Sequence, residues 1–521
     1  MTLSFWWALL ALPSAPPRPK LVVVITVDQL RPDYLDRWKR QLTGGLLQLT
    51  AEGAVFTNAY QDHAVTETAP GHSTILSGRW PAHTGIISND FGVQDSTAPL
   101  VGTTGAGASP RRFRGTAFLD WLRAVDPGAR ALSVSVKDRG AILPMGQARA
   151  DVFWLSFATG QFTTSRYYAD SLPAWVRAFN AKLHPPAPWP LLLPDSAYAE
   201  ADDEPWENGG RNRTFPHTPS PNCTSAPSGG CATPALDSLT LELAWTGLET
   251  LRLGRRNGTD LLAVSLSTTD YVGHAYGPDS REIHDQVLRL DRSLAWFFKR
   301  LSDRLGRDNV VIVLTADHGV TPFPERTQAK TGAPAYRVTL DTLVTAVNRQ
   351  FDGLAGATGA PPRAWLLFDS GMLLLRDNGR FGAVGANRDS MLDAVAARIR
   401  AVAGVARVDR AERLAGADTA SDPVARRWVH HVPPDAGVVL TVSLQPGSVW
   451  AASAPIAMHG QPSDFDAHVP IIFWGRGVKR GTYSGRANTV DIAPTLGRLL
   501  GVTPLSLIDG SVLTDAIAPR N

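Results

Sequence analysis

Short runs of apolar, mostly β-branched residues recur along the chain, and each is closed by a polar or turn-forming residue. They span residues 21–28 (LVVVITVD), 131–137 (ALSVSVK), 261–270 (LLAVSLSTTD), 309–319 (NVVIVLTADHG) and 469–475 (VPIIFWG). Near-continuous apolar runs are typical of strands that helices cover on both faces. The pattern therefore predicts a parallel-type sheet between two helical layers.

Helical periodicity separates these runs. From residue 282 to residue 305, apolar side chains recur every three or four positions with Arg, Asp and Lys between them, which predicts an amphipathic helix. A shorter helix is expected over residues 491–500, where Ile492, Leu496 and Leu499 share a face. Alternating strands and helices predict an α/β fold, a three-layer sandwich with a mostly parallel central sheet and inserted subdomain loops.

Two stretches differ from this alternation. Residues from about 185 to 234 are dense in Pro, Gly, Asn and Ser, which predicts a surface insertion, and residues from about 322 to 455 mix short strands with a helical run near 391–402, as a subdomain would. A chain of 521 residues exceeds the usual size of a single core. We expect one catalytic domain over residues 19–521 that carries these two insertions.

Composition narrows the choice of partners. Lys and Arg together number 51 against 48 Asp and Glu, a balance that argues against a nucleic-acid-binding protein. No stretch of the chain is long and apolar enough to cross a membrane, so we expect no stable membrane span. The oligomeric state is not predicted by any of these features.

The N-terminus indicates export. Residues 3–12 (LSFWWALLAL) have the length of a signal-peptide core and are too short to span a bilayer, so residues 1–18 are expected to be a signal peptide and the protein periplasmic or secreted. No Lys or Arg precedes this run, which leaves open an N-terminus packed on the domain. Cys223 and Cys231, the only cysteines, are expected to close a loop as a disulfide in an oxidising compartment.

Polar residues at the ends of the apolar runs form the candidate site. Asp28, Lys137, Asp270 and Asp317 each close a run, and ligands bind at the carboxyl ends of strands in open α/β sheets. His274 of DYVGH, His318 of ADHG and His459 of MHG add imidazoles. Three carboxylates and three imidazoles with no sulfur suit Zn²⁺ or a similar divalent ion and are enough for two metals.

Each of these residues has an ordinary structural alternative. An Asp at a strand end often caps a helix, and a His beside Gly often is a simple loop residue. Their joint occurrence at several strand ends favours a metal site. We expect the D-x-x-x-H of residues 270–274 to lie in the turn after its strand and to bring both side chains onto one ion.

Residues 66–72 (TETAPGH) supply the candidate nucleophile. They place a hydroxyl in a turn bounded by Gly and Pro, and the following GHSTILSG is typical of a helix start. Backbone N–H groups at a helix N-terminus bind phosphate oxygens. A threonine hydroxyl activated by a base or a metal is therefore expected to face an anion here.

The motifs together resemble a known family. VDQLRPDYL, TETAPGHSTILSG, HTGIISND, SVKDRGAILP, DYVGH, TADHG and MHG followed by HVPIIFWG occur in this order over nearly the whole chain. They resemble the alkaline phosphatase superfamily, most closely the bacterial secreted phosphate-irrepressible alkaline phosphatases with a threonine nucleophile, with the nucleotide pyrophosphatase/phosphodiesterases as near relatives. The resemblance implies an alkaline phosphatase-like fold.

The resemblance also implies roles for individual residues. The nucleophile is Thr68, not Thr66. Asp28, Thr68, Asp317 and His318 are expected to hold one Zn²⁺ ion, and Asp270, His274 and His459 the other. Asn89 is expected to hydrogen-bond a phosphoryl oxygen, and Lys137 and Arg139 to contact the remaining oxygens. His468 is a rival of His459 as the last ligand, but the relatives place that ligand in an HG turn before the strand.

The implied reaction is hydrolysis of phosphate monoesters through a phosphothreonine, with release of inorganic phosphate. Lys137 and Arg139 favour this substrate class, because a monoester dianion has three non-bridging oxygens for the two cations to neutralise. The main alternative is a phosphodiesterase or nucleotide pyrophosphatase with the same metal site. A sulfatase is not supported, because Thr occupies position 68 without the required Arg. A non-catalytic phosphate-binding relative is not supported either, because all the proposed ligands are present.

Overall fold

A computed structural model describes residues 18–184, 187–219, 233–354, 365–376 and 387–519. Its central feature is a nine-stranded sheet with the order β16-β2-β15-β8-β1-β7-β4-β5-β6. The strands are β1 (Leu21–Val27), β2 (Ala54–Phe56), β4 (Ala131–Ser135), β5 (Asp151–Ser156), β6 (Gln161–Thr163), β7 (Asp260–Leu266), β8 (Val310–Thr315), β15 (Ile471–Gly475) and β16 (Gly481–Tyr483). Strands β8, β1, β7, β4 and β5 run parallel, whereas β15 is antiparallel to both of its neighbours. The predicted mostly parallel sheet is confirmed.

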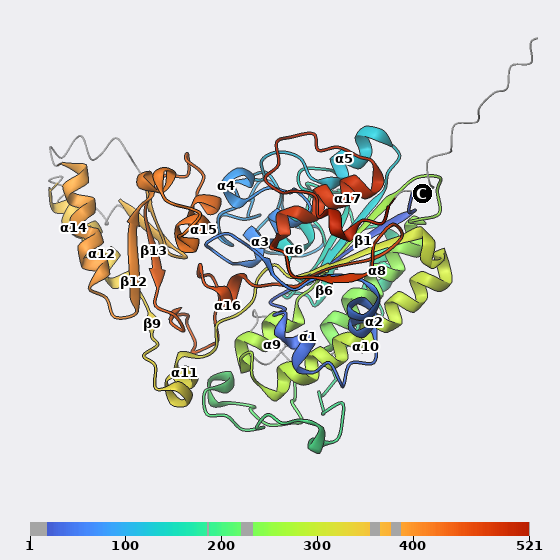
Figure 1. The fold of residues 1–521 in the computed structure, drawn as a ribbon, viewed down its shortest axis with the longest axis horizontal. Helices are drawn as coiled ribbons and strands as arrows, with labels where there is room; N and C mark the ends of the chain where they lie inside the picture. Colours follow the sequence, from blue (N-terminus) through green and yellow to red (C-terminus); the bar gives the residue numbers. More distant parts are fainter. Residues whose placement is uncertain (1–17, 185–186, 220–232, 355–364, 377–386, 520–521) are drawn as a thin grey trace, which may run out of the picture.

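Helices cover both faces of this sheet (Figure 1). One layer contains α2 (Gly45–Glu52), α8 (Ala235–Leu251) and α10 (Arg281–Leu305), and the other contains α3 (Thr68–Ile75), α5 (Phe118–Val125), α6 (Asp138–Ile142) and α17 (Ile492–Leu500). The remaining short elements around them are α1 (Asp33–Arg37), β3 (Ala59–Tyr60), α4 (Pro81–Thr84), α7 (Ala174–Asn180), α9 (Thr268–Tyr276), α11 (Pro324–Thr331), α16 (Asp464–Ala467) and β17 (Ala487–Asn488).

Strand β1 shows why a continuous apolar run suits this position. Val23 and Ile25 pack in the core on the α8/α10 side, while Val22 and Val24 pack in the core on the opposite side. Because successive side chains point to opposite faces, a strand between two helical layers needs apolar residues at every position. The three-layer sandwich expected from the sequence follows from this double burial.

The two predicted helices begin and end close to their expected limits. Helix α10 starts after Ser280, whose side chain accepts a hydrogen bond from Ile283 N, and it stops at Gly306, which has a φ of 80°. A serine N-cap and a glycine past the last turn are the usual signals of helix limits. Helix α17 likewise ends at Gly501, with a φ of 65°.

One predicted element is partly wrong. The run 261–270 was expected to be a strand throughout, but β7 ends at Leu266, and Asp270 lies in helix α9 with His274 one turn later. The first turn of α9 is fixed by Asp237 of α8, whose Oδ1 accepts from Thr268 N at 3.0 Å. This contact joins residues 31 positions apart, so the local pattern could not reveal it.

The first predicted insertion appears in part as a loop segment anchored on α10. Residues 187–219 run beside α9 and α10 with only short 3₁₀ turns (Figure 1). Trp189 Nε1 donates to Asp285 Oδ2 at 2.6 Å, and Tyr198 OH donates to Asp285 Oδ1 at 2.6 Å. The buried carboxylate of Asp285 thus holds two distant points of the segment on the helix.

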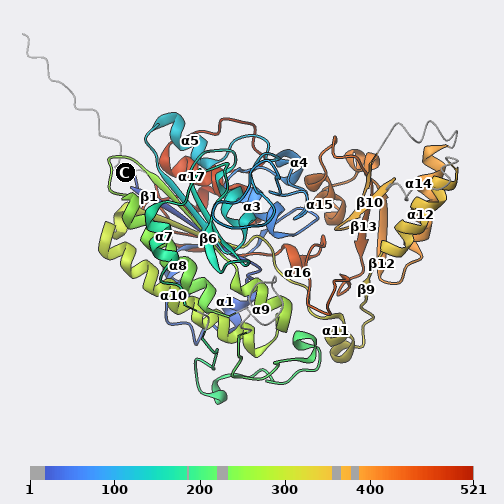
Figure 2. The same ribbon diagram turned by 180° about the vertical axis from the view of Figure 1, so that it is seen from behind.

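A second sheet lies between β8 and β15 in the chain. We call residues 337–450 the inserted unit; its antiparallel sheet has the order β10-β11-β13-β12 and its own apolar core. The elements are β9 (Arg337–Val338), α12 (Asp341–Leu354), β10 (Leu366–Asp369), β11 (Met372–Leu375), α14 (Arg388–Arg400), β12 (Val405–Arg410), α15 (Pro423–His431), β13 (Val438–Leu444) and β14 (Val449–Trp450). Helices α12 and α14 lie on the outer side, and α15 lies toward the main sheet (Figure 2).

Two predictions fall wholly or mainly outside the described residues. Residues 1–17 of the expected signal peptide, together with Cys223 and Cys231, are not among them, so the leader and the disulfide stay predictions. Within the described ranges, no helix has both the length and the apolarity that a membrane crossing requires.

Candidate active site

The sheet order brings the predicted strand-end residues together. Neighbouring strands β8, β1, β7 and β4 are followed by Asp317, Asp28, Asp270 and Lys137, respectively. All four strands run parallel, so their carboxyl ends meet at one edge of the sheet. Residues far apart in sequence therefore meet in one buried place.

Two overlapping groups of side chains have the geometry of metal ligands. In one group, ligand atoms of Asp28, Asp317 and His318 all lie within 4.8 Å of one another, and in the other the same holds for Asp270, His318 and His459. His318 was expected to share one ion with Asp28, Thr68 and Asp317, and its ligand atom belongs to both groups.

His274 completes the second group from helix α9. Its Nε2 lies 3.1 Å from Asp270 Oδ1 and 3.2 Å from His459 Nε2. The expected turn is instead one helical turn, and the four-residue spacing places both side chains on the same face. The two side chains therefore lie close together, on a helix and not in the expected turn, and their role as a ligand pair stays a prediction.

The three histidines present the same ring nitrogen to the site. Nδ1 lies next to a backbone carbonyl in each ring, at 2.6 Å for His274 and Ala457 O, 2.7 Å for His459 and Thr66 O, and 2.9 Å for His318 and Gly319 O. With Nδ1–H donating to the carbonyl, Nε2 carries the lone pair and faces the carboxylates. Burial lowers the pKa of His318 to about 3, so its ring is neutral, as a metal ligand must be.

The charge balance of the site also fits divalent cations. Asp28 Oδ1, Asp317 Oδ2 and His318 Nε2 are buried without a hydrogen-bond partner among the described residues. Burial raises the pKa of Asp28, and the carboxylates of Asp270 and Asp317 raise it further. Unpaired buried acceptors with excess negative charge are costly unless a cation binds them.

Lys137 is the cation that the chain itself supplies. Its Nζ lies 2.6 Å from both Asp28 Oδ2 and Asp270 Oδ2, and 3.3 Å from Thr68 Oγ1. Burial opposes the charge, but the adjacent carboxylates of Asp270 and Asp28 hold the pKa of Lys137 above its usual range. The ammonium therefore stays charged beside the predicted nucleophile.

Thr68 is the first residue of helix α3, where the helix meets the end of β8. The approach is so close that a Cβ built on Gly71 would lie 2.2 Å from the carbonyl oxygen of Asp317. Only glycine fits there, which explains the Gly of PGH. Ala69 N–H is already bonded and Pro70 has none, so this helix end offers fewer free donors than expected.

Asn89 and Arg139 complete the site with Lys137. Ala69 N donates to Asn89 Oδ1 at 3.0 Å, which leaves the Nδ2 donor of this amide for the cavity. That cavity has a volume of about 390 Å³ and is lined by Thr68, Asn89, Lys137 and Arg139 together with His274 and His459. Three nitrogen-bearing side chains thus line the same cavity as Thr68.

Gln29 supports the carboxylates, although nothing in its residue type predicted it. It has a φ of 65°, and its backbone N donates to Asp317 Oδ1 at 3.1 Å while Nε2 donates to Asp270 Oδ1 at 2.8 Å. A left-handed conformation is unusual for glutamine and is retained where the surroundings require it. Its position directly after Asp28 was the available signal.

Thr66 and Asp466 support the imidazoles, and sequence reasoning missed both roles. Thr66 receives His459 Nδ1–H on its carbonyl and Gly460 N–H on Oγ1 at 3.2 Å. Buried Asp466 accepts from Thr321 Oγ1 at 2.7 Å and from Gln461 N at 3.0 Å, and its carbonyl accepts from Gly319 N at 2.6 Å. Asp466 therefore ties the DHG turn to the MHG turn.

Comparison with known proteins agrees with this geometry. Residues 22–401 match the family model described as Type I phosphodiesterase / nucleotide pyrophosphatase. The chain is 34% identical to alkaline phosphatase PhoV of Synechococcus elongatus, over 97% of this chain and 94% of the relative. It is 32% identical to alkaline phosphatase PafA of Elizabethkingia meningoseptica, over 97% and 95%. The PafA crystal structure superposes with a TM-score of 0.87 at 30% identity, over 97% of this chain and all of that one.

The chain belongs to the Type I phosphodiesterase / nucleotide pyrophosphatase family. PhoV and PafA, which it matches over nearly their whole length, are bacterial alkaline phosphatases, so the resemblance inferred from the motifs is confirmed, as is the alkaline phosphatase-like fold.

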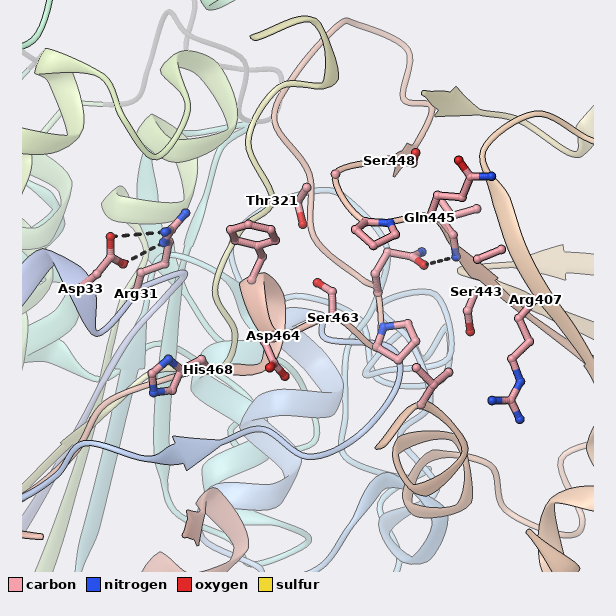
Figure 3. Close-up of a pocket in the computed structure, with 18 of the residues that line it drawn as sticks. Arg31, Asp33, Thr321, Arg407, Ser443, Gln445, Ser448, Ser463, Asp464 and His468 are labelled. Carbon is pink, nitrogen blue, oxygen red and sulfur yellow. Dashed lines mark hydrogen bonds and ion pairs between the residues drawn. The ribbon is translucent and has the colours of Figure 1, made fainter. Parts of the chain in front are cut away.

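His468, the rival ligand, lies outside both groups of candidate metal ligands. Its Nε2 lies 3.0 Å from Thr57 O, and its ring stacks on Tyr60 at 5.0 Å. It lines a larger cavity of about 790 Å³ between the main sheet and the inserted unit, with Arg31 and Arg407 on opposite sides (Figure 3). None of the predicted catalytic or metal residues lines that cavity, so its size does not make it the active site.

Proposed function

We propose that the protein hydrolyses phosphate monoesters and releases inorganic phosphate through a phosphothreonine on Thr68. The observation that carries the proposal is the position of Thr68 Oγ1, 3.3 Å from Lys137 Nζ, in the cavity that Asn89 and Arg139 also line. The full-length alkaline phosphatase relatives support a hydrolase of the phosphomonoesterase type.

Two Zn²⁺ ions are the proposed cofactors. Asp28, Thr68, Asp317 and His318 would hold one, and Asp270, His274 and His459 the other; the overlapping ligand groups and unpaired buried acceptors support this assignment. Oxygen and nitrogen ligands without sulfur are compatible with zinc. When bound, such a pair supplies Lewis-acid charge that lowers the pKa of the nucleophilic hydroxyl and stabilises the leaving oxygen.

The chain's own residues carry the displacement. Thr68 Oγ1 attacks phosphorus, an Oγ–P bond forms, and the bond from phosphorus to the ester oxygen breaks, so that the alcohol leaves. Negative charge on the non-bridging oxygens is met by Asn89 Nδ2, Lys137 Nζ and the Arg139 guanidinium. Water then cleaves the phosphothreonine and frees phosphate and the Thr68 hydroxyl.

Lys137 and Arg139 also bear on the choice between monoesters and diesters. A monoester dianion offers oxygens to both cations, whereas a diester substituent would occupy one of those places. The alternative is a phosphodiesterase or nucleotide pyrophosphatase, as the family description names. Comparing p-nitrophenyl phosphate with bis-p-nitrophenyl phosphate decides between them, and a large preference for the diester would refute the monoesterase proposal.

Thr68→Ala tests the nucleophile. We expect it to abolish the burst of phosphoenzyme and to reduce turnover by about 10³-fold or more, because no other hydroxyl occupies this position. Zinc content, measured by mass spectrometry of the purified protein, should stay mostly intact, since the remaining ligands are unchanged. Wild-type turnover in this variant would refute the assignment.

We further propose that the enzyme acts on small phosphate monoesters outside the cytoplasm, in the periplasm or medium. The expected signal peptide supports this location. Cell fractionation and N-terminal sequencing of the exported protein test it, and a mature chain retained in the cytoplasm with residue 1 in place would contradict it.

A further inference from the structure

The inserted unit reaches the active site through one hairpin turn. Strands β10 and β11 pair antiparallel, with Asp369 opposite Met372, so Ser370 and Gly371 form a two-residue turn. Their φ angles are 48° and 86°. Two positive φ angles define the tight hairpin turn that favours Asn-Gly or Gly-Gly, and serine is an unusual first residue. A side chain kept against this preference points to a role for its hydroxyl.

The hydroxyl of Ser370 contacts the residue before the proposed nucleophile. Ser370 Oγ donates to Glu67 Oε1 at 2.5 Å, and the backbone N of Asn89 donates to Glu67 Oε2 at 2.8 Å. Beside this link, Ser88 Oγ donates to Asp369 Oδ2. One carboxylate thus joins the tip of the inserted unit to the loop that carries Asn89.

The loop around Asn89 depends on such contacts because it has no regular secondary structure. Asn89 is held at three points: its N–H by Glu67, its Oδ1 by Ala69 N at 3.0 Å, and its carbonyl by Gln94 Nε2 at 2.8 Å. Of these three contacts, only the one with Glu67 leads on to the inserted unit; the bonds of Ser88 with Asp369 and of Ile87 O with His431 join the neighbouring loop residues to that unit. Moving the Glu67 carboxylate would therefore shift the backbone of Asn89, and with it the side-chain amide of Asn89, relative to Thr68.

We propose that Glu67 and Ser370 are positioning residues through which the inserted unit holds the Asn89 amide at the phosphate site. The inference rests on the proposed monoesterase function. It assigns separate tasks to the three residues of the TET triplet: Thr66 orients His459, Glu67 orients Asn89, and Thr68 attacks.

Ser370→Gly is the first test. Glycine adopts the positive φ of this turn at least as well as serine, so the hairpin keeps its shape and the melting temperature should not fall. The change removes the hydroxymethyl group and with it the bonds of Ser370 Oγ to Glu67 Oε1 and to Asp369 Oδ1. We expect kcat/KM for p-nitrophenyl phosphate to fall about 3–10-fold. The matched control is Asn208→Gly, another residue with a positive φ of 45°, which lies in the segment 187–219 and should retain full activity.

Glu67→Gln is the second test. The oxygen of a glutamine side chain can accept the hydrogen bond of Ser370 Oγ or of Asn89 N, but its NH₂ group then faces the other of these two donors. We expect kcat/KM to fall about 10–100-fold and inhibition by inorganic phosphate to weaken, with unchanged zinc content. Glu242→Gln, an exposed change on α8, is the control.

A double-mutant cycle with Asn89→Ala separates positioning from general damage. If Glu67 acts through Asn89, Glu67→Gln should change kcat/KM by less than about 2-fold in the Asn89→Ala background. An equal loss in both backgrounds, or wild-type kinetics and phosphate inhibition in Ser370→Gly and Glu67→Gln, would overturn the proposal. Failure of the proposed function itself would appear differently, as a wild-type enzyme that does not hydrolyse the monoester.

Discussion

The main sheet and the inserted sheet contribute to the site in different ways. The main sheet places Asp317, Asp28, Asp270 and Lys137 at the ends of adjacent parallel strands, within 4 Å of a neighbour in the same site. The inserted sheet is antiparallel and touches the site through a hairpin turn at Ser370. Parallel strand ends bring chemical groups together directly, whereas a turn on a second sheet can adjust groups already in place.

The interface between the two sheets supports this distinction. Val65 and Ile87 of the main part pack with Met372 and Trp428 of the inserted unit in a separate apolar cluster. Val65 directly precedes the TET triplet in sequence, and Ile87 lies two residues before Asn89. Among the described residues, this cluster therefore joins the inserted unit to the segments next to the proposed nucleophile, and it contains no residue of the strands that carry the carboxylates.

Metal removal should reduce activity more than any other change, and the loss should arise at the carboxylates that follow the strands of the main sheet. We expect a strong chelator, or Asp317→Asn, to reduce kcat/KM by about 10³-fold or more, because the carboxylates would lose the cations that neutralise them. Zinc should restore activity to the chelated enzyme but not to the variant. Measured turnover that survives complete zinc loss would show that the strand-end cluster is not the catalytic centre.

A Gly→Ala substitution should lower stability at the active site and raise it in the inserted unit. Gly71→Ala places a Cβ 2.2 Å from Asp317 O, so α3 must move away from β8, and we expect activity to fall about 10²-fold with a lower melting temperature. Among the described residues, no neighbouring atom lies within 4 Å of the Cβ position of Gly353 in α12. Gly353→Ala should therefore stabilise the inserted unit by about 0.5–1 kcal/mol, from helix propensity.

Calorimetry and kinetics on both glycine variants test this contrast. A normal rate in Gly71→Ala would mean that the close approach of α3 to β8 does not set the position of Thr68. Loss of activity in Gly353→Ala would mean that the two regions do not differ in the expected way.

Asp466→Asn tests the carboxylate that joins two ligand-bearing turns. The asparagine NH₂ would face either Thr321 Oγ1 or Gln461 N, both of which donate to Asp466 now. We expect zinc affinity to fall about 10–100-fold, since contacts behind the ligands fix their orientation. Asp464→Asn on the same short helix is the control, because its side chain is 75% exposed. Equal zinc affinity in all three proteins would limit Asp466 to a packing role.

The sequence predicted the parts of the fold that depend on local pattern. Strand β1 and helix α10 followed from burial on both faces and from helical periodicity, and the strand-end order located Asp28 and Asp317. Helix α9 was missed because Asp237, 31 residues away, fixes its first turn. The contacts of Gln29, Glu67 and Asp466 were not predicted, since each side chain bonds to groups that are distant in sequence and are brought near by the fold.

The segment 187–219 should affect stability more than chemistry, through its contact with α10. Glu207 of this segment and Glu282 of α10 are both buried, and burial together with the charge of Glu282 raises the pKa of Glu207 from 4.5 to about 9. A raised carboxyl pKa means that the folded state binds a proton that the unfolded state releases above about pH 4.5. The stabilisation is complete below that pH and is lost as the pH rises toward 9.

Glu207→Gln cannot ionise, so its melting temperature should fall less between pH 6 and pH 9 than that of the wild type, by about 2–4 °C. Differential scanning fluorimetry at matched ionic strength measures the difference, with exposed Glu242→Gln as the control. Turnover of p-nitrophenyl phosphate at 25 °C should stay within about 2-fold of wild type, since neither glutamate lines the catalytic cavity. Parallel melting curves for the two proteins would show that folding does not raise the pKa of Glu207.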